Sequence, residues 1–158
     1  MAVDMTVKIG DFKGESVITG HEGEIDVLSF SLGGTQSGTM HTSTGGGAGK
    51  ANVQDLSLTK WVDLASPDLM LACFNGTHIA EAVLTARKAG EKPLEYLKIT
   101  MTDCLISSVS TGGSGGEDRF TENVSINFAK VKVDYDTQVA KGGKGAHGSM
   151  EYNIAKTA

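Results

Sequence analysis

The sequence predicts a mainly β protein, a sandwich or barrel with one short helix beside it. Apolar and polar residues alternate with a period of two in many segments, which is typical of half-buried strands. Glycine-rich stretches separate several of these segments, as expected of the connections in an all-β fold. Helix signals stand out at one place, between Ser66 and Gly76.

The expected strands each place apolar side chains on one face and polar side chains on the other. In chain order they occupy Val3–Ile9, Glu24–Leu32, Val53–Thr59, Ile79–Lys88, Tyr96–Ser110, a long segment ending near Tyr135, and Ser149–Ile154.

The long segment before Tyr135 is the most informative of these strands. Apolar residues alternate up to Phe128 and resume at Val131, so the phase slips once, which predicts a bulge near Ala129–Lys130. The strand is about fifteen residues long, against a usual five or six. A strand of that length must be covered on both edges, or it pairs with other chains. The pattern therefore suggests a protein that assembles.

The helix has recognisable ends. Ser66 can cap its first turn, Pro67 suits the first helical position, Asp68 favours the positive end of the helix dipole, and Gly76 suits a left-handed cap. Apolar residues four apart form a stripe that can cover a sheet edge or face, Leu69 with Cys73 and Met70 with Phe74.

The chain of 158 residues is expected to form one domain, 1–158, with flexible connections. An extended loop is expected at about 34–50, where glycines are frequent and no apolar period is visible. Loops of more than about 12–15 residues are usually functional or disordered. Gly112–Gly116 is a second flexible stretch, and a third covers about 136–148.

Composition excludes several classes of protein. The formal charge of −5 argues against nucleic acid as a partner. No apolar run is long enough for membrane insertion, and no signal peptide is visible, so we expect a chain made in the cytoplasm and exported, if at all, by another machine. Neither Cys73 nor Cys104 has metal-ligand spacing, the histidines are scattered, and no cofactor is indicated.

Two motifs partly match known catalytic or phosphate-binding sequences, but each lacks the neighbouring structure or spacing that such a site needs. Gly112-Gly-Ser114-Gly-Gly116 matches the nucleophile pattern of hydrolases, but strands are expected on both sides, where that motif needs a strand followed by a helix. Gly45–Lys50 lacks the spacing of a phosphate-binding loop. Glu117, Asp118 and Glu122 cluster around Arg119, which favours an ion-pair cluster over paired catalytic carboxylates.

The polar faces of the strands are small and mostly uncharged, where an ordinary exposed sheet carries more Lys and Glu. A wall of this kind suits a water-filled channel or a close subunit contact, although the β propensity of threonine alone is an alternative. Its members are Ser29, Ser31, Ser57, Thr59, Thr100, Thr102, Ser107, Ser125 and Asn127.

Several motifs resemble one family over most of the chain. They include Glu24-Ile-Asp-Val-Leu, Gly45-Gly-Gly-Ala-Gly-Lys, Ser66-Pro-Asp-Leu-Met, and a long ungapped run, Ser107-Ser-Val-Ser-Thr-Gly-Gly-Ser-Gly-Gly-Glu-Asp-Arg, followed by Thr121-Glu-Asn-Val. The chain resembles the Hcp family (haemolysin-coregulated protein), the tube proteins of type VI secretion. Leu32 stands where the family often has an aromatic residue, Tyr152-Asn-Ile replaces Trp-Asn-Ile, and 136–149 matches poorly.

The resemblance implies a small β-barrel of two sheets with one helix alongside, without catalysis. It implies a homohexameric ring, rings stacked into a tube, a contractile sheath that expels the tube, a spike protein, VgrG, that caps it, and a lumen that carries effector proteins before secretion. A phage-type tail tube protein, a barrel that binds a small ligand and a hydrolase using Ser114 are the alternatives.

Two sets of residues follow from these considerations. The polar phase predicts that the lumen-facing positions include Ser29, Ser31, Ser57 and Thr59. Contacts between subunits or rings are expected from the long loop and the glycine-rich turn, at Gln36, Ser37, Gly45, Gly46, Gly47, Lys50, Glu117, Asp118 and Arg119.

Overall fold

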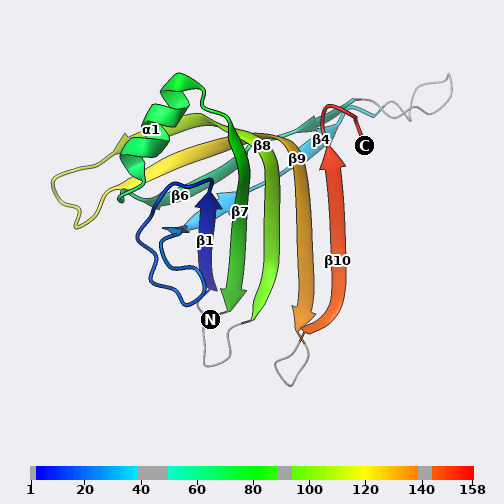
Figure 1. The fold of residues 1–158 in the computed structure, drawn as a ribbon, viewed down its shortest axis with the longest axis horizontal. Helices are drawn as coiled ribbons and strands as arrows, with labels where there is room; N and C mark the ends of the chain where they lie inside the picture. The colour runs from blue at the N-terminus through cyan, green and yellow to red at the C-terminus, as the bar shows by residue number, and fades with distance from the viewer. Residues whose placement is uncertain (1–2, 39–49, 89–93, 139–143) are drawn as a thin grey trace.

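The computed structural model describes residues 3–38, 50–88, 94–138 and 144–158, which hold ten strands and one helix (Figure 1). In chain order the elements are β1 (Val3–Ile9), β2 (Ile25–Asp26), β3 (Ser29–Ser31), β4 (Gly34–Gln36), β5 (Ala51–Val53), β6 (Leu56–Trp61), α1 (Ser66–Asn75), β7 (Ile79–Lys88), β8 (Glu95–Gly112), β9 (Thr121–Gln138) and β10 (Lys144–Asn153).

The strands form one antiparallel sheet of eight and a separate ribbon of two. The path through the large sheet is β2-β1-β7-β8-β9-β6-β3, and β10 also pairs with β9. The ribbon consists of β4 and β5. β9 has three partners because it is long: its first residues pair with β6 and its last residues with β10.

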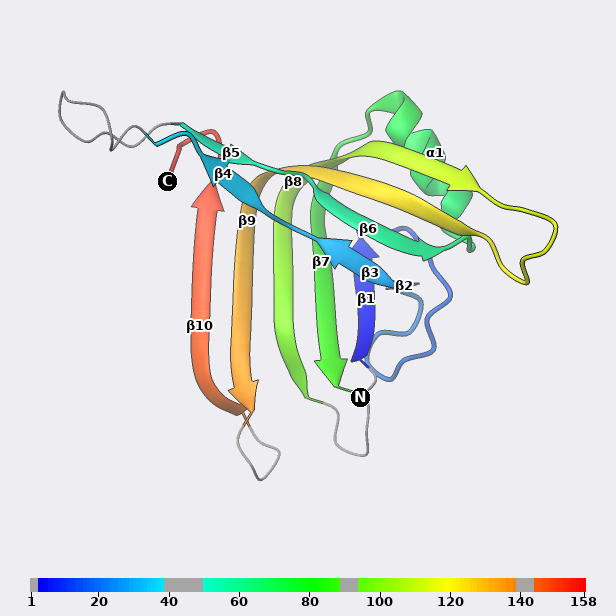
Figure 2. The same ribbon diagram turned by 180° about the vertical axis from the view of Figure 1, so that it is seen from behind.

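The strands β8 and β9 bend together and so divide the sheet into two layers (Figures 1 and 2). The first layer contains β1, β7, the first half of β8, the second half of β9, and β10. The second layer contains the second half of β8, the first half of β9, β6 and β3. One cluster of buried apolar side chains fills the space enclosed by the layers and α1, including Leu56, Leu69, Ile99, Met101 and Ile126.

The phase slip read from the sequence is real, but the predicted bulge near Ala129–Lys130 is wrong. Both strands slip at the same level: Met101 and Cys104 are buried on β8, as are Phe128 and Val131 on β9. The register between the two strands is the same on both sides of this level. A joint slip keeps the register, because neither strand gains a residue relative to the other.

Two irregularities of β8 accompany the bend. Asp103, at the level of the slip, has a φ of 54°, a left-handed conformation that Asp tolerates better than most residues. The shift of register between β8 and β9 lies further along, between Ile106 and Ser108, so that Ser107 is the extra residue. A bulge of this kind increases local twist and bending.

The expected mainly β fold of two sheets with one helix alongside is confirmed, but the large sheet is open, so the fold is not a strict barrel. Its two ends, β2 and β3, belong to one stretch of chain that was predicted as a single strand, Glu24–Leu32. Between them Val27 donates a backbone hydrogen bond to Met5 (3.0 Å) and Leu28 donates one to Thr59 (2.8 Å). The chain thus joins the two ends of the sheet near β1, while the side of β10 remains open.

The helix α1 forms where it was predicted, with some differences at its ends and faces. Gly76 follows it with a φ of 63°, which confirms the left-handed cap. Ser66 does not cap, because the capping position is Ala65 and the Ser66 hydroxyl bonds elsewhere. Leu69 is buried, but Phe74 is 74% exposed, so the predicted stripe covers the core only in part.

The connections are shorter than predicted. The loop expected at about 34–50 forms the β4–β5 ladder at its two ends, and 39–49 lie outside the described residues. Most of the flexible segment expected at 136–148 belongs to β9 and β10, which extend as a long hairpin. Its residues 139–143 lie outside the described residues.

A half-buried histidine attaches the loop between β1 and β2 to the rest of the fold. His21 Nδ1 lies 2.9 Å from Glu24 Oε2, and His21 Nε2 lies 2.5 Å from Glu95 Oε1 at the start of β8. Arg87 donates a hydrogen bond to the Thr19 carbonyl (3.2 Å). Burial lowers the pKa of His21, but the hydrogen bonds and charges of the two carboxylates outweigh it, so the pKa is raised.

The raised pKa predicts a pH-dependent contribution to stability. The charged ring stabilises the fold fully below pH 6.5, and this contribution is lost as the pH rises through the raised pKa. We expect His21→Gln to cost roughly 0.5–1 kcal/mol at low pH and less at high pH. Urea unfolding of both proteins, at pH values from below 6.5 to above the raised pKa, would measure this difference in stability. His78→Gln is the control, because the His78–Asp103 pair is exposed; a pH-independent effect of His21→Gln would contradict the assignment.

Candidate functional site

Small polar side chains form rows on the outer face of the second layer. Cross-strand register places Ser29 beside Thr59 and Ser31 beside Ser57, and β6 continues each row into β9. The rows end on β8, where Ser108 pairs with Ser125. We call this surface the polar wall, with the members Ser29, Ser31, Ser57, Thr59, Ser107, Ser108, Ser110, Asn123, Ser125 and Asn127, and Asp55 at its margin.

The side chains of the polar wall bond to one another. Thr59 donates a hydrogen bond to the Asn123 side-chain oxygen (2.8 Å), and the hydroxyls of Ser57 and Ser125 lie 3.3 Å apart. Asp55 accepts hydrogen bonds from Ser107 (2.6 Å) and Asn127 (2.8 Å). A shallow groove of about 330 Å³ runs over this surface between β3, β6 and β9. The wall is therefore polar and, apart from Asp55 at its margin, uncharged.

The four residues expected to face a lumen, Ser29, Ser31, Ser57 and Thr59, lie together on this wall. Thr100 and Thr102 lie on the first layer instead, because the phase slip at Asp103 and the bend separate them from the later residues of β8. Sequence alternation identified the polar phase of each strand, but only the register shows which polar phases share one surface.

The residues expected at subunit contacts lie at two opposite ends of the molecule (Figure 2). Gln36, Ser37 and Lys50 are exposed at the end of the β4–β5 ribbon, where Ser37 accepts a hydrogen bond from the Lys50 amide (3.0 Å). Gly45, Gly46 and Gly47 lie outside the described residues. Glu117, Asp118 and Arg119 lie in the turn between β8 and β9 at the other end.

The turn between β8 and β9 is held by local packing. The guanidinium carbon of Arg119 lies 4.6 Å from the centre of the Trp61 ring, a cation–π geometry. A Cβ at Gly113 would lie 2.1 Å from the Phe120 ring, so a larger residue there would force this ring to move. Ser114 donates a hydrogen bond to Glu117 (3.1 Å) and lies between two strands, so the context of a hydrolase nucleophile is absent.

The layer that carries the polar wall has an unpaired edge on each side, among the strands that the structure describes. β7 pairs with β8 only as far as Cys104, so residues 105–112 of β8 pair with β9 alone. At the other side β3 pairs only with β6. The backbone donors and acceptors of an unpaired strand edge can pair with a strand of another chain.

An ion pair lies buried beneath the polar wall. Lys60 and Glu122 point inward from β6 and β9, each with 0% exposure, and Lys60 Nζ bonds directly to Glu122 Oε1. Lys60 also donates to Asp63 (3.0 Å) and Ser66 (3.2 Å). The period-two alternation that buries Leu56 and Leu58 also places Lys60 on the core face, so this signal was present in the sequence.

Hydrogen bonds keep the buried carboxylate ionised. Burial raises the pKa of Glu122, but bonds from Lys60, Ser66 (2.6 Å) and Thr111 (2.7 Å), together with the Lys60 charge, outweigh burial and lower it below its ordinary value. The cluster connects β6, β8, β9 and the start of α1, and all its members bond within the protein. We therefore assign it a structural role.

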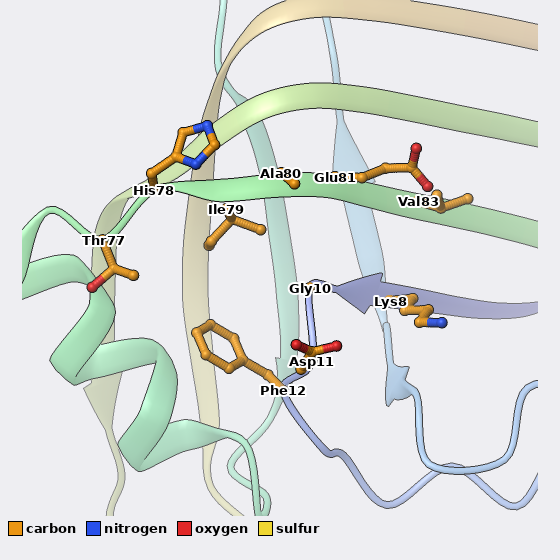
Figure 3. A pocket seen from close by; sticks show the side chains of 10 residues that line it. All are labelled: Lys8, Gly10, Asp11, Phe12, Thr77, His78, Ile79, Ala80, Glu81 and Val83. Atoms are coloured by element: carbon orange, nitrogen blue, oxygen red, sulfur yellow. The ribbon is translucent and has the colours of Figure 1, made fainter.

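A second concavity lies on the first layer, away from the polar wall (Figure 3). It has a volume of about 400 Å³, and it lies between the ends of β1 and α1 and the start of β7. Phe12 and Ile79 face it, with Lys8 and Glu81 beside them. Within the described residues, no group of three or more His, Cys, Asp and Glu side chains is arranged to hold a metal ion.

Comparisons with known proteins identify the family. The family model described as "Type VI secretion system effector, Hcp" matches residues 6–135. The chain is 60% identical over 145 residues to "Protein hcp1" of Pseudomonas aeruginosa strain PAO1, an alignment that covers 91% of this chain and 90% of that protein. This chain belongs to the Hcp family.

Solved structures of Hcp and other type VI secretion proteins share the fold. The crystal structure of Hcp1 from Salmonella typhimurium has a TM-score of 0.81 at 39% identity, covering 99% of this chain and 98% of that one. A type VI secretion effector from Yersinia pestis has a TM-score of 0.78 at 33% identity, covering 96% and 100%. A further type six secretion system protein reaches 0.93 at 28% identity, covering 99% of both chains. The resemblance stated from the sequence is thus confirmed.

The described part of this Hcp chain contains no helix that is both long and apolar enough to span a membrane.

Removing one partner of the buried ion pair should lower the free energy of unfolding far more than removing one partner of an exposed ion pair. We expect Lys60→Met to destabilise this Hcp protein by about 3–5 kcal/mol, because Glu122 would be left buried without its counter-charge. Adding Glu122→Gln should restore much of the loss. Lys130→Met is the control, since the Lys130–Glu151 pair (2.9 Å) is exposed and should contribute about 1 kcal/mol or less. Equal losses in denaturant unfolding would contradict the assignment.

Proposed function

We propose that this chain is a structural subunit of the inner tube of a type VI secretion system. Six copies form a ring, and rings stack into a tube whose lumen holds effector proteins. The observation that carries the proposal is the layer bearing the polar wall, which is uncharged over most of its outer face and unpaired along both edges.

The two free edges favour closure into a ring. They are different strands, β3 and the second half of β8, so a contact between them joins copies head to tail. A head-to-tail contact repeated by rotation closes into a ring and leaves no edge unpaired. The polar faces of successive copies then form one continuous inner wall.

The chemistry of the polar wall suits a hydrated lumen. Serine, threonine and asparagine side chains hydrogen-bond readily with water, and Asp55 already accepts two hydrogen bonds from its neighbours. The proposal places Ser29, Ser31, Ser57 and Thr59 against cargo. A barrel that binds a small ligand is less well supported, because packed apolar side chains fill the space between the layers.

The projecting ends of the subunit are suited to contacts along and around the tube. The β4–β5 ribbon extends away from the body, as does the turn between β8 and β9 at the opposite end (Figure 1). Gln36, Ser37 and Lys50 are exposed at the first end, and Glu117, Asp118 and Arg119 are exposed in the turn. We propose that these ends contact neighbouring subunits or rings, including through Gly45, Gly46 and Gly47. The sheath, the spike protein VgrG and effectors are the remaining proposed partners of a tube that is assembled in the cytoplasm and then secreted.

The ring is tested by the mass of the purified protein. The chain mass is 16.5 kDa, and light scattering after gel filtration should give about six times this value. Negative-stain microscopy should show annular particles. A strictly monomeric protein at high micromolar concentration would contradict the proposal.

A bulky side chain on the polar wall should obstruct the lumen without breaking the ring. We expect Ser31→Trp to retain the mass of the ring and to reduce effector binding or secretion severalfold, because the indole would occupy space proposed for cargo. The control is Ser149→Trp, at an exposed serine on β10 of the other layer. Dissociation of the Ser31→Trp ring would instead place Ser31 at a subunit boundary.

A further inference from the structure

The open side of the sheet exposes part of the apolar core. A groove of about 540 Å³ lies between the β4–β5 ribbon and the strands β9 and β10. Leu32, Val53, Val131, Met150 and Tyr152 line it, and Met150 is 47% exposed. Leu32, Val53 and Tyr152 also pack against the buried core. The groove is therefore the flank at which closure of the two layers is incomplete.

The outer face of α1 carries apolar side chains that nothing in the described chain covers. Its inner face buries Leu69 and Ala72, whereas Leu71 is 58% and Phe74 is 74% exposed. Leu64, just before the helix, is 62% exposed. The spacing of three and four residues aligns Asp68 with these side chains along one stripe. We call this surface the α1 stripe.

The groove and the α1 stripe are complementary and lie in opposite halves of the molecule. Figures 1 and 2 both show α1 on one side and the ribbon with the end of β10 on the other. The stripe carries the acidic Asp68. Lys50 directly precedes β5 at the groove, and Lys156 lies in the C-terminal segment that runs beside the ribbon. Among the described residues neither lysine has an ion-pair partner.

We propose that the α1 stripe of one copy docks into the groove of the next copy, with Leu71 and Phe74 entering it and Asp68 facing Lys50 or Lys156. This inference rests on the proposed ring. In a ring each surface must meet a different surface of the neighbouring copy, because the contacts are head to tail. The occupant of the groove therefore comes from another part of the same sequence. We choose the α1 stripe because Leu64, Leu71 and Phe74 are among the most exposed large apolar side chains of the described residues.

The docked α1 stripe covers the apolar groove at the open side of the sheet. Each copy covers its neighbour's exposed core flank, while backbone pairing of β3 with β8 aligns the polar wall. The apolar contact provides the hydrophobic gain of assembly, since its side chains are water-exposed in the isolated chain.

Cross-linking tests the contact directly. Phe74→Cys and Met150→Cys are prepared as separate proteins, both carrying Cys73→Ala, and mixed during ring assembly with a short bis-maleimide. Cys104 remains, because burial raises the pKa of its thiol to about 11 and makes it unreactive. We expect a covalent dimer from the mixture and little from either protein alone. Val17→Cys replaces Phe74→Cys as the control, since Val17 is 88% exposed in a loop.

A second variant separates this contact from the ring itself. Leu71→Ser with Phe74→Ser should lower the mass from ring to smaller species at micromolar concentration, with the monomer's circular dichroism unchanged. Val17→Ser should leave the ring intact. A wild-type monomer would defeat the proposed function. A second pair of results would defeat only this contact while leaving the proposed ring in place. In that case the wild type forms a ring, the Leu71→Ser, Phe74→Ser variant forms a ring of the same mass, and cysteines at positions 74 and 150 do not cross-link.

Discussion

The architecture depends on one pair of strands, β8 and β9, which are 18 residues each and remain paired through a bend. Because both strands slip phase at the level of Asp103, side chains on either side of the bend still point into a single core. The same bend separates the first layer, whose exposed residues include the charged Lys8, Glu81 and Lys132, from the mostly uncharged polar wall on the second. Without it, the sheet would be a single layer with no enclosed core.

Much of the fold was accessible from the sequence because alternation is a local signal. β1, β7 and the length of β9 were predicted well, and Gly76 marked the end of α1. The bulge was misplaced because a phase slip in one strand cannot reveal that its partner slips too. The Glu24–Leu32 segment was predicted as one strand because its pattern is continuous, whereas its two ends pair with different strands.

The candidate site could be predicted in part from the sequence. The small polar residues were visible in the sequence, but their assembly into rows requires the register between β3, β6 and β9. Lys60 followed the core phase with Leu56 and Leu58, and a lysine there predicts a buried counter-charge, yet its partner Glu122 lies on another strand. Such pairings are long-range, and local patterns do not specify them.

The hydrogen bonds that members of the polar wall make with one another affect how a passenger protein would travel past it. A hydroxyl already bonded to its neighbour, as Thr59 is to Asn123, gains little by exchanging that bond for one with a guest. Many weak, interchangeable contacts hold a guest without any deep energetic trap. In the proposed tube, such a lining would let cargo be retained at rest and slide free on ejection.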